Sequence, residues 1–313
     1  MIINSHVHVN TNKNYFFYHN YGLMPFLQEM QENNIDIAFP AINPKVGFFR
    51  CPNDCSMHCG KQVNNNLNNC HCKHSNRHRV GILEENASLV IRCKTCGKTL
   101  LTSTVDALRD YNIALIQMTR PYRKKIKPLL YIALCKATIQ AEIDFFEKNF
   151  PHEFVGFKLH PWNDQVSVAD FKLHTTKPIL IHTGVRDLES AKNAAIFAKN
   201  NPELKVVIAH AAALDEEVLK EIAQLDNAYI DCCPSSFLYE TKSTSLFSPQ
   251  DILTPEDIYY KALDFLPSNK ILFGTDSPWG NSKQELAVVS RLQVPADVKE
   301  EILYQNAIKI YLQ

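Results

Sequence analysis

Residues 178–210 read PILIHTGVRDLESAKNAAIFAKNNPELKVVIAH and contain a complete strand–helix–strand unit. Two short apolar runs, PILIHTG and KVVIAH, flank the helix-like segment ESAKNAAIFAKNN. Continuous apolar strands joined through a helix are typical of parallel strands that are buried on both faces. This stretch therefore predicts a parallel sheet covered by helices.

The same alternation extends along most of the chain and predicts a closed (β/α)8 barrel, because eight strand-like runs are present. An open doubly wound sheet is the structural alternative, but no GxGxxG turn follows any of the runs, which disfavours it. The eight runs are IINSHVHV (2–9), IDIAFP (35–40), PLLYIALCKA (128–137), FVGFKLHP (154–161), PILIHTG (178–184), KVVIAHAA (205–212), NAYIDCC (227–233) and KILFGTDSP (270–278).

The composition is that of an ordinary globular protein, with 313 residues of which 45% are apolar and 21% charged. Lys+Arg and Asp+Glu both number 33, which argues against a surface built as a whole for nucleic acid or an anionic membrane. The start, MIINSHVHVN, lacks a secretory leader pattern, and no apolar run approaches the roughly 18 residues of a membrane span. We therefore expect a cytoplasmic protein.

Residues 47–104 differ in composition from the rest and predict an insertion into a barrel formed by 1–46 and 105–313. This segment is rich in Asn and carries eight Lys/Arg against three Asp/Glu, whereas the remainder carries 25 against 30. It also holds seven of the ten cysteines. Because the insertion follows the second strand, it would leave the barrel at the carboxyl ends of the strands, the mouth of the barrel. We therefore expect it to act as a lid or as a surface that binds a partner.

The cysteine spacing in the insertion favours structural zinc, because clustered cysteines in a reducing compartment are more often metal ligands than disulfides. The seven candidate ligands are Cys51, Cys55, Cys59, Cys70, Cys72, Cys93 and Cys96. The last two form a CxxCG knuckle, and four nearby histidines add further candidates: His58, His71, His74 and His78. The C-x3-C-x3-C spacing misses the C-x3-C-x2-C of radical iron–sulfur proteins by one residue. The remaining cysteines, Cys135, Cys232 and Cys233, are expected to be small buried residues.

Metal-binding side chains end four of the predicted strands. His6 and His8 share one face of the first strand because of their period-two spacing, and His182, His210 and Asp276 end the fifth, sixth and eighth. In a (β/α)8 barrel these ends meet at the mouth. The sequence therefore predicts a site for a divalent ion such as zinc, iron or manganese.

These residues carry a resemblance to the amidohydrolase superfamily, in particular its amidohydrolase-2 branch. The matching motifs are HVH at residue 6, GFKLHP at residue 156, IHTG at residue 181, IAH at residue 208, FGTDSP at residue 273 and the ending NAIKIYL. The resemblance covers nearly the whole chain except the insertion. It implies a barrel with one or two divalent metals at the strand ends.

By this resemblance, His6, His8, His182 and Asp276 are the metal ligands. Asp276 is also the proton acceptor for the metal-bound water, and His210 orients or deprotonates that water or polarises the substrate.

The fourth strand leaves the number of metals open. Two-metal members place a carboxylated lysine or a glutamate there, and this chain offers Lys158 and His160. Lys158 is thus a candidate metal bridge, or else a lysine that pairs with a carboxylate or a substrate anion, and His160 is a candidate pocket residue. Where the branch often has glycines after the sixth strand, this chain has Ala211-Ala212-Ala213. Candidate substrate contacts at loop positions are Trp162, Arg186 and Trp279.

The resemblance implies a metal-dependent hydrolase that cleaves an amide, ester or lactone-like bond in a small molecule. A non-oxidative decarboxylase or a hydratase of the same branch is the first alternative. Two others are a TatD-type nuclease, which should carry a glutamate on the fourth strand, and an inactive barrel with a zinc-dependent binding insertion. Homo-oligomerisation, the metal identity and the substrate stay open.

Overall fold

The computed structural model describes residues 1–11, 21–42, 79–83, 88–93, 99–164, 166–184, 187–236 and 253–313. Eight parallel strands form one sheet in the order β1-β2-β6-β7-β8-β9-β10-β11, so neighbours in space follow one another along the chain. Their bounds are Ile3–His8 (β1), Ile37–Ala41 (β2), Leu129–Tyr131 (β6), Gly156–Leu159 (β7), Ile179–Ile181 (β8), Val206–Ile208 (β9), Ala228–Asp231 (β10) and Ile271–Leu272 (β11). Seven of them lie within the strand-like runs of the sequence, and β2 continues one residue beyond its run, to Ala41.

The sheet closes on itself because the chain after β11 pairs with β1. The backbone N–H of Ser5 donates to the carbonyl of Phe273 at 3.1 Å, and that of Thr275 donates to the carbonyl of His6 at 3.1 Å. A parallel bridge between Val7 and Ser277 extends the contact to the mouth. The predicted (β/α)8 barrel, a TIM barrel, is confirmed.

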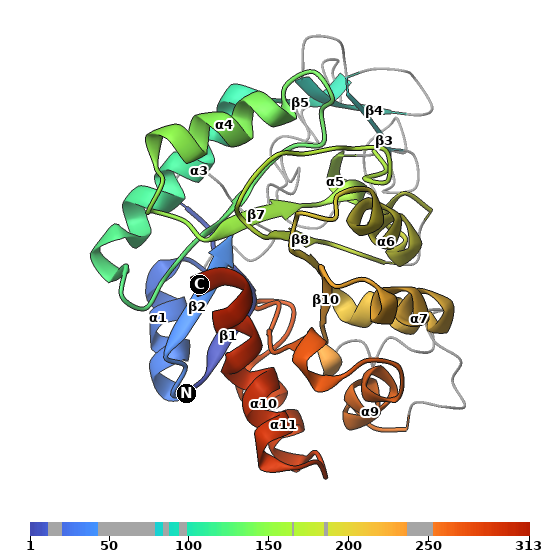
Figure 1. Cartoon of the computed structure of the whole chain (residues 1–313). Coiled ribbons are helices and arrows are strands. Elements are labelled where there is room, and N and C mark those ends of the chain that lie inside the picture. Colours follow the sequence, from blue (N-terminus) through green and yellow to red (C-terminus); the bar gives the residue numbers. More distant parts are fainter. Residues whose placement is uncertain are drawn as a thin grey trace, which may run out of the picture.

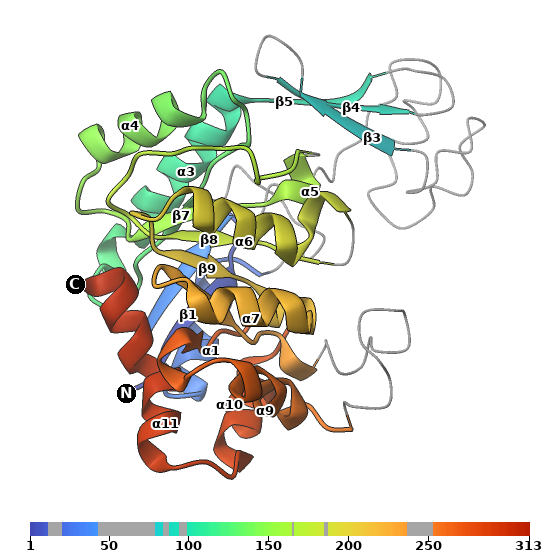
Figure 2. The same cartoon turned by 45° about the vertical axis from the view of Figure 1, so that its right-hand side comes forward.

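Helices cover the outer face of the barrel (Figures 1 and 2). The helices are α1 (Leu23–Glu32), α3 (Val105–Thr119), α4 (Ile139–Asn149), α5 (Pro161–Asp164), α6 (Ala191–Asn200), α7 (Glu216–Gln224), α9 (Glu256–Phe265), α10 (Ser282–Arg291) and α11 (Ala296–Glu300). Two π-helical segments, Glu301–Gln305 and Ile308–Leu312, continue the last of these. No helix among the described residues has both the length and the apolar character of a membrane span.

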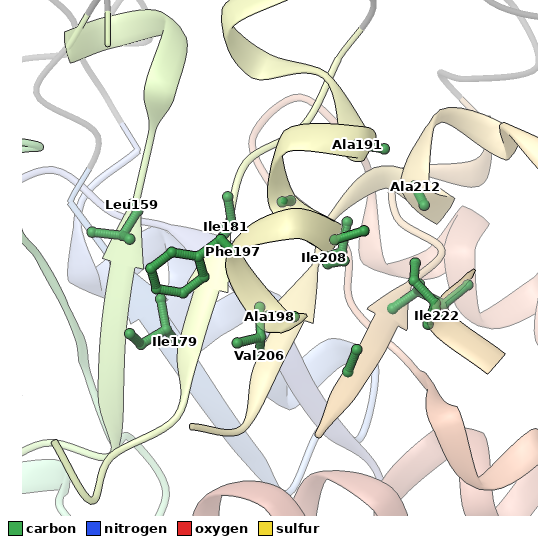
Figure 3. Packing of buried hydrophobic residues seen from close by; sticks show 14 of the residues in the cluster. Leu159, Ile179, Ile181, Ala191, Phe197, Ala198, Val206, Ile208, Ala212 and Ile222 are labelled. Atoms are coloured by element: carbon green, nitrogen blue, oxygen red, sulfur yellow. The ribbon is translucent and has the colours of Figure 1, made fainter. Parts of the chain in front are cut away.

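Alternate residues of each strand enter two different apolar clusters, as the period of two requires. Ile179 and Ile181 of β8 face outward and pack with Phe197 and Ala198 of α6 (Figure 3). Leu180, between them, belongs to the inner cluster, which Tyr311 of the C-terminal helix also joins. One end of the barrel interior is therefore filled by apolar side chains.

Lys158, between the outward-facing Phe157 and Leu159 of β7, falls on the inner face, and so does Asp231, which follows the outward-facing Ile230 of β10. The inward positions thus change from apolar to polar toward the ends of the strands. This change places the candidate site at the mouth.

A second, three-stranded antiparallel sheet lies in the chain between β2 and β6. It consists of β3 (Arg79–Leu83), β4 (Ser88–Cys93) and β5 (Thr99–Thr104), and β3 lies beside α5 (Figures 1 and 2). The VGIL and SLVI runs of the cysteine-rich segment form β3 and β4. Since α5 directly follows β7, this sheet lies on the mouth side of the barrel. The zinc ligands predicted in this segment lie outside the described residues, except for Cys93, of which only the backbone is described.

The helix-like segment ESAKNAAIFAKNN of the sequence forms α6, whereas no sequence pattern indicated a helix at α10. This helix carries buried Glu285, which accepts hydrogen bonds from the backbone and hydroxyl groups of Ser235 and Ser236. A carboxylate in a buried helix face interrupts the apolar period that predicts helices. Its function here is to hold the loop that follows β10.

Asp164 similarly fixes α5 to strand β6. It is fully buried, accepts the Tyr131 hydroxyl hydrogen at 2.5 Å and accepts the backbone N–H of Leu134 at 2.8 Å. Burial raises the pKa of Asp164 to about 7, although both hydrogen bonds oppose the rise. The folded state therefore binds a proton at Asp164 more tightly than an unfolded chain, whose aspartates titrate near pH 4.

For Asp164→Asn we expect a changed pH dependence of stability. In the parent, the stabilisation from protonated Asp164 is complete below about pH 4 and is lost as the pH rises through 7. The neutral amide can accept from Leu134 and donate to the Tyr131 oxygen at every pH. Urea unfolding between pH 4 and 8 should show the free energy of the variant rising relative to the parent as the pH increases. Exposed Asp170→Asn is the control, and a pH-independent difference for Asp164→Asn would contradict the account.

Candidate metal centre

Three of the predicted ligands meet at the mouth of the barrel. Nε2 of His6 lies 3.4 Å and Nε2 of His8 3.3 Å from the same oxygen, Oδ1 of Asp276. All three side chains are buried. Their ligand atoms all lie within 4.8 Å of one another. Metal–ligand bonds of about 2.1 Å place adjacent ligand atoms roughly 3.0–3.5 Å apart, so the two contacts have the spacing that a divalent ion requires.

Barrel closure produces this cluster. The backbone N–H of Asp276 donates to the His6 carbonyl at 2.8 Å, and Asp276 adopts a left-handed φ of 51°. Burial alone would raise the pKa of Asp276, but the neighbouring His6 and His8 hold it below its usual range. The cluster therefore supplies one carboxylate oxygen and two imidazole nitrogens, a donor set suited to zinc, manganese or iron.

Lys158 lies at the centre of the site, as its position on β7 predicts. Its Nζ is 2.8 Å from Nε2 of His6, and the side chain is fully buried. Burial lowers the pKa of Lys158 to about 8, against the opposing effects of Asp276 and Asp231. The lone pair on His6 Nε2 can accept from this amine or bind a metal ion, but it cannot do both.

His182 does not join the group formed by His6, His8 and Asp276, although it was predicted to be a ligand. Its Nδ1 lies 2.9 Å from Nε2 of His210, and its Nε2 lies 3.2 Å from Oε2 of Glu189. The side chain of His182 is 24% exposed, so it faces the open mouth. His160 stacks on the His182 ring with 3.7 Å between centroids.

Hydrogen bonding fixes the position of one hydrogen of the His182–His210 pair. Nδ1 of His210 lies 2.6 Å from the carbonyl of Cys233, which can only accept, so this nitrogen carries a hydrogen. The contact between the rings needs a second hydrogen, on either Nε2 of His210 or Nδ1 of His182. Burial, together with nearby His160, lowers the pKa of His182 and so favours its neutral form.

Two buried carboxylates at the site were not predicted. Asp231 ends β10, where the rule that placed the other ligands at strand ends would also have selected it, and its Oδ2 lies 3.0 Å from Nδ1 of His6. Glu189 lies in a short helical turn, Asp187–Glu189, for which the sequence gives no comparable signal.

Of the other predicted site residues, Trp279 contacts the edge of His8, with 5.4 Å between the ring centroids. Arg186 lies outside the described residues, as does the Trp162 side chain. Cys135, Cys232 and Cys233 are buried, as expected. The interpretation of Cys233 as purely apolar is incomplete, however, because its Sγ lies 3.1 Å from Oδ1 of Asp231.

His210 begins a left-handed turn. Residues 210–214 all have φ between 51° and 58°, and three of them are alanines. This conformation costs roughly 1–2 kcal/mol per residue for side chains with a Cβ. The three alanines thus place strain next to His210.

We expect Ala213→Gly to stabilise the protein by about 1 kcal/mol, since glycine adopts positive φ without strain and Ala213 is only partly buried. Ala287→Gly, in the right-handed helix α10, should instead destabilise it by about 1 kcal/mol. Chemical unfolding of both variants measures the difference. Equal destabilisation by the two glycines would show that the turn is not strained.

Comparison with known proteins adds a family match.

An amidohydrolase family model matches residues 177–312. The match covers less than half of the chain and includes His182, His210 and Asp276, but neither His6 nor His8. No curated protein matches the chain by sequence.

Solved structures share the fold over nearly the full length. The 5-carboxyvanillate decarboxylase of Sphingomonas paucimobilis has a TM-score of 0.62 at 12% identity, covering 99% of this chain and 98% of that one. A dihydroxybenzoic acid decarboxylase from Polaromonas with bound manganese has a TM-score of 0.60 at 10% identity, covering 99% and 96%. The 4-oxalomesaconate hydratase of Rhodopseudomonas palustris has a TM-score of 0.55 at 11% identity, covering 100% and 96%.

Proposed function

We propose that this chain is a metal-dependent enzyme of the amidohydrolase type in which His6, His8 and Asp276 hold one divalent ion. The observation that carries the proposal is the approach of both imidazole Nε2 atoms to one oxygen of Asp276, at 3.4 and 3.3 Å. The family match and the manganese in the Polaromonas decarboxylase support it. Bound there, the ion would supply Lewis-acid polarisation of a substrate oxygen.

The proposed substrate is a small carboxylic acid. Lys158, His160 and the His182–His210 pair lie beside the cluster and offer hydrogen-bond donors to an anion. Decarboxylases of hydroxylated aromatic acids are among the proteins that share the fold.

We favour a lyase reaction, either loss of CO2 or addition of water, over hydrolysis. In decarboxylation the C–C bond breaks, CO2 leaves, and the vacated carbon takes a proton. The His182–His210 pair can supply that proton at the exposed edge of His182. The solved structures that share the fold include two decarboxylases and a hydratase, which supports this choice.

Hydrolysis is the second candidate, and the family description favours it.

For the insertion, the spacing of its seven cysteines supports structural zinc, separate from the barrel metal.

Metal content tests both sites in the full chain. Purified parent protein should contain a barrel metal and structural zinc, and His6→Ala/His8→Ala should lose the barrel equivalent alone. Cys93→Ser/Cys96→Ser should lose zinc alone. A His152→Ala/His174→Ala variant, which replaces two exposed histidines, is the matched control. Inductively coupled plasma mass spectrometry measures the metal content of all four proteins. A His6→Ala/His8→Ala variant with the parent's metal content would disprove the barrel site.

Reaction products separate the two candidates. Manganese-loaded protein incubated in D2O with hydroxybenzoic acids labelled with ¹³C at the carboxyl group should release labelled CO2 and place deuterium on the vacated carbon. His210→Gln should slow this release by about 10²–10⁴-fold, since it removes a proton donor. Incorporation of ¹⁸O from water into the products of an ester and lactone panel, without CO2 release, would instead establish hydrolysis.

A further inference from the structure

Asp231 forms hydrogen bonds with His6, His210 and Cys233. The last residue of β10, it lies fully buried inside the barrel mouth. Its Oδ2 is hydrogen-bonded to Nδ1 of His6 at 3.0 Å. Its Oδ1 accepts the backbone N–H groups of His210 at 3.1 Å and Cys233 at 3.3 Å, as well as the Cys233 thiol at 3.1 Å. One carboxylate thus joins three strand ends.

The contacts of His6 define which ring nitrogen carries its hydrogen. Its Nε2 lies 2.8 Å from the amine of Lys158, and an ammonium group can only donate. Nε2 must therefore accept, which leaves the single hydrogen of the neutral ring on Nδ1. This hydrogen is donated to Asp231. Oδ1 of Asp276 lies 3.4 Å from the same Nε2.

We propose that Asp231 is a positioning residue that keeps His6 in the tautomer able to bind the metal ion and ties that ring to the backbone of His210. The inference rests on the proposed metal site at His6. Carboxylates that hold a ligating histidine through its other nitrogen fix the orientation of the ring and raise its affinity for the metal. Here the same carboxylate also fixes the start of the left-handed turn.

The chain after β11 packs closely against two partners of Asp231. A Cβ at Gly274 would lie 2.7 Å from the Cys233 sulfur and 2.9 Å from the His6 Cβ. A glycine at position 274 therefore lets this segment approach His6 and Cys233.

Asp231→Asn tests this proposal, because the surrounding backbone N–H groups determine the orientation of the new amide group. Two backbone N–H groups point at the position of Oδ1, so the amide oxygen must occupy it. The amide NH2 then takes the place of Oδ2 and donates to Nδ1 of His6. His6 is thereby driven to the opposite tautomer, with its hydrogen on Nε2, where the metal would bind.

Two measurements on the full chain test the proposal. Nitrogen-15 NMR of the histidine rings in metal-free protein should show His6 protonated on Nδ1 in the parent and on Nε2 in Asp231→Asn. Manganese titration followed by electron paramagnetic resonance should show affinity about 10–100-fold weaker in the variant. Manganese suits this titration because it disfavours thiolate ligands, so the cysteines of the insertion do not compete.

Asp164→Asn is the matched control, since it also neutralises a fully buried carboxylate at the barrel mouth but has no contact with His6. It should keep the parent's His6 tautomer and manganese affinity. A parent His6 protonated on Nε2 would overturn the proposal even if the Asp231 variant does not fold. So would an Asp231→Asn protein that keeps the parent's tautomer and binds manganese within twofold of the parent. Failure of the parent to bind manganese would contradict the proposed function, whereas the change of tautomer between the parent and Asp231→Asn tests the role of Asp231 without metal.

Discussion

The site depends on the hydrogen bonds through which the end of the chain's last strand closes the barrel onto β1. Thr275 and Asp276 both donate their backbone N–H groups to the carbonyl of His6, and His8 donates to Ser277. These bonds place residues that are about 270 positions apart in the sequence within one cluster. Without closure, the two histidines of β1 would be separated from the carboxylate that completes the candidate metal site.

The barrel mouth tolerates its buried ionisable groups because acidic and basic side chains lie next to one another. An unpaired ion inside a protein costs several kcal/mol. Here Asp231 pairs with His6, Asp276 with His6 and His8, and Glu189 with His182. Apolar side chains fill the opposite end of the interior, so stability and chemistry occupy different ends of the same strands, as is usual for this fold.

The sequence could predict the barrel and most of the site because both follow from short-range periodicity. Apolar strand runs identify all eight strands, and residues at the ends of such runs in a barrel necessarily meet at the mouth. This reasoning brings His6, His8, Asp276 and Lys158 together correctly. Strand-end positions do not predict which neighbour each side chain contacts at the mouth.

His182 is the clearest case. Its position at a strand end predicts a ligand, yet its nitrogens contact His210 and Glu189, a partner held by a turn with no sequence signature. Asp231 was available to the same strand-end argument, but its role appears only when the contacts of both its oxygens are known. Helix α10 was not predicted because buried Glu285 interrupts its apolar face.

The claim on which the rest depends is that one divalent ion binds between His6, His8 and Asp276. A crystal structure of the manganese-loaded protein, with anomalous scattering recorded above and below the manganese edge, tests it directly. The account predicts an anomalous peak about 2.1–2.3 Å from both imidazole Nε2 atoms and from a carboxylate oxygen of Asp276. Manganese found only elsewhere, with Lys158 still hydrogen-bonded to His6, would contradict it.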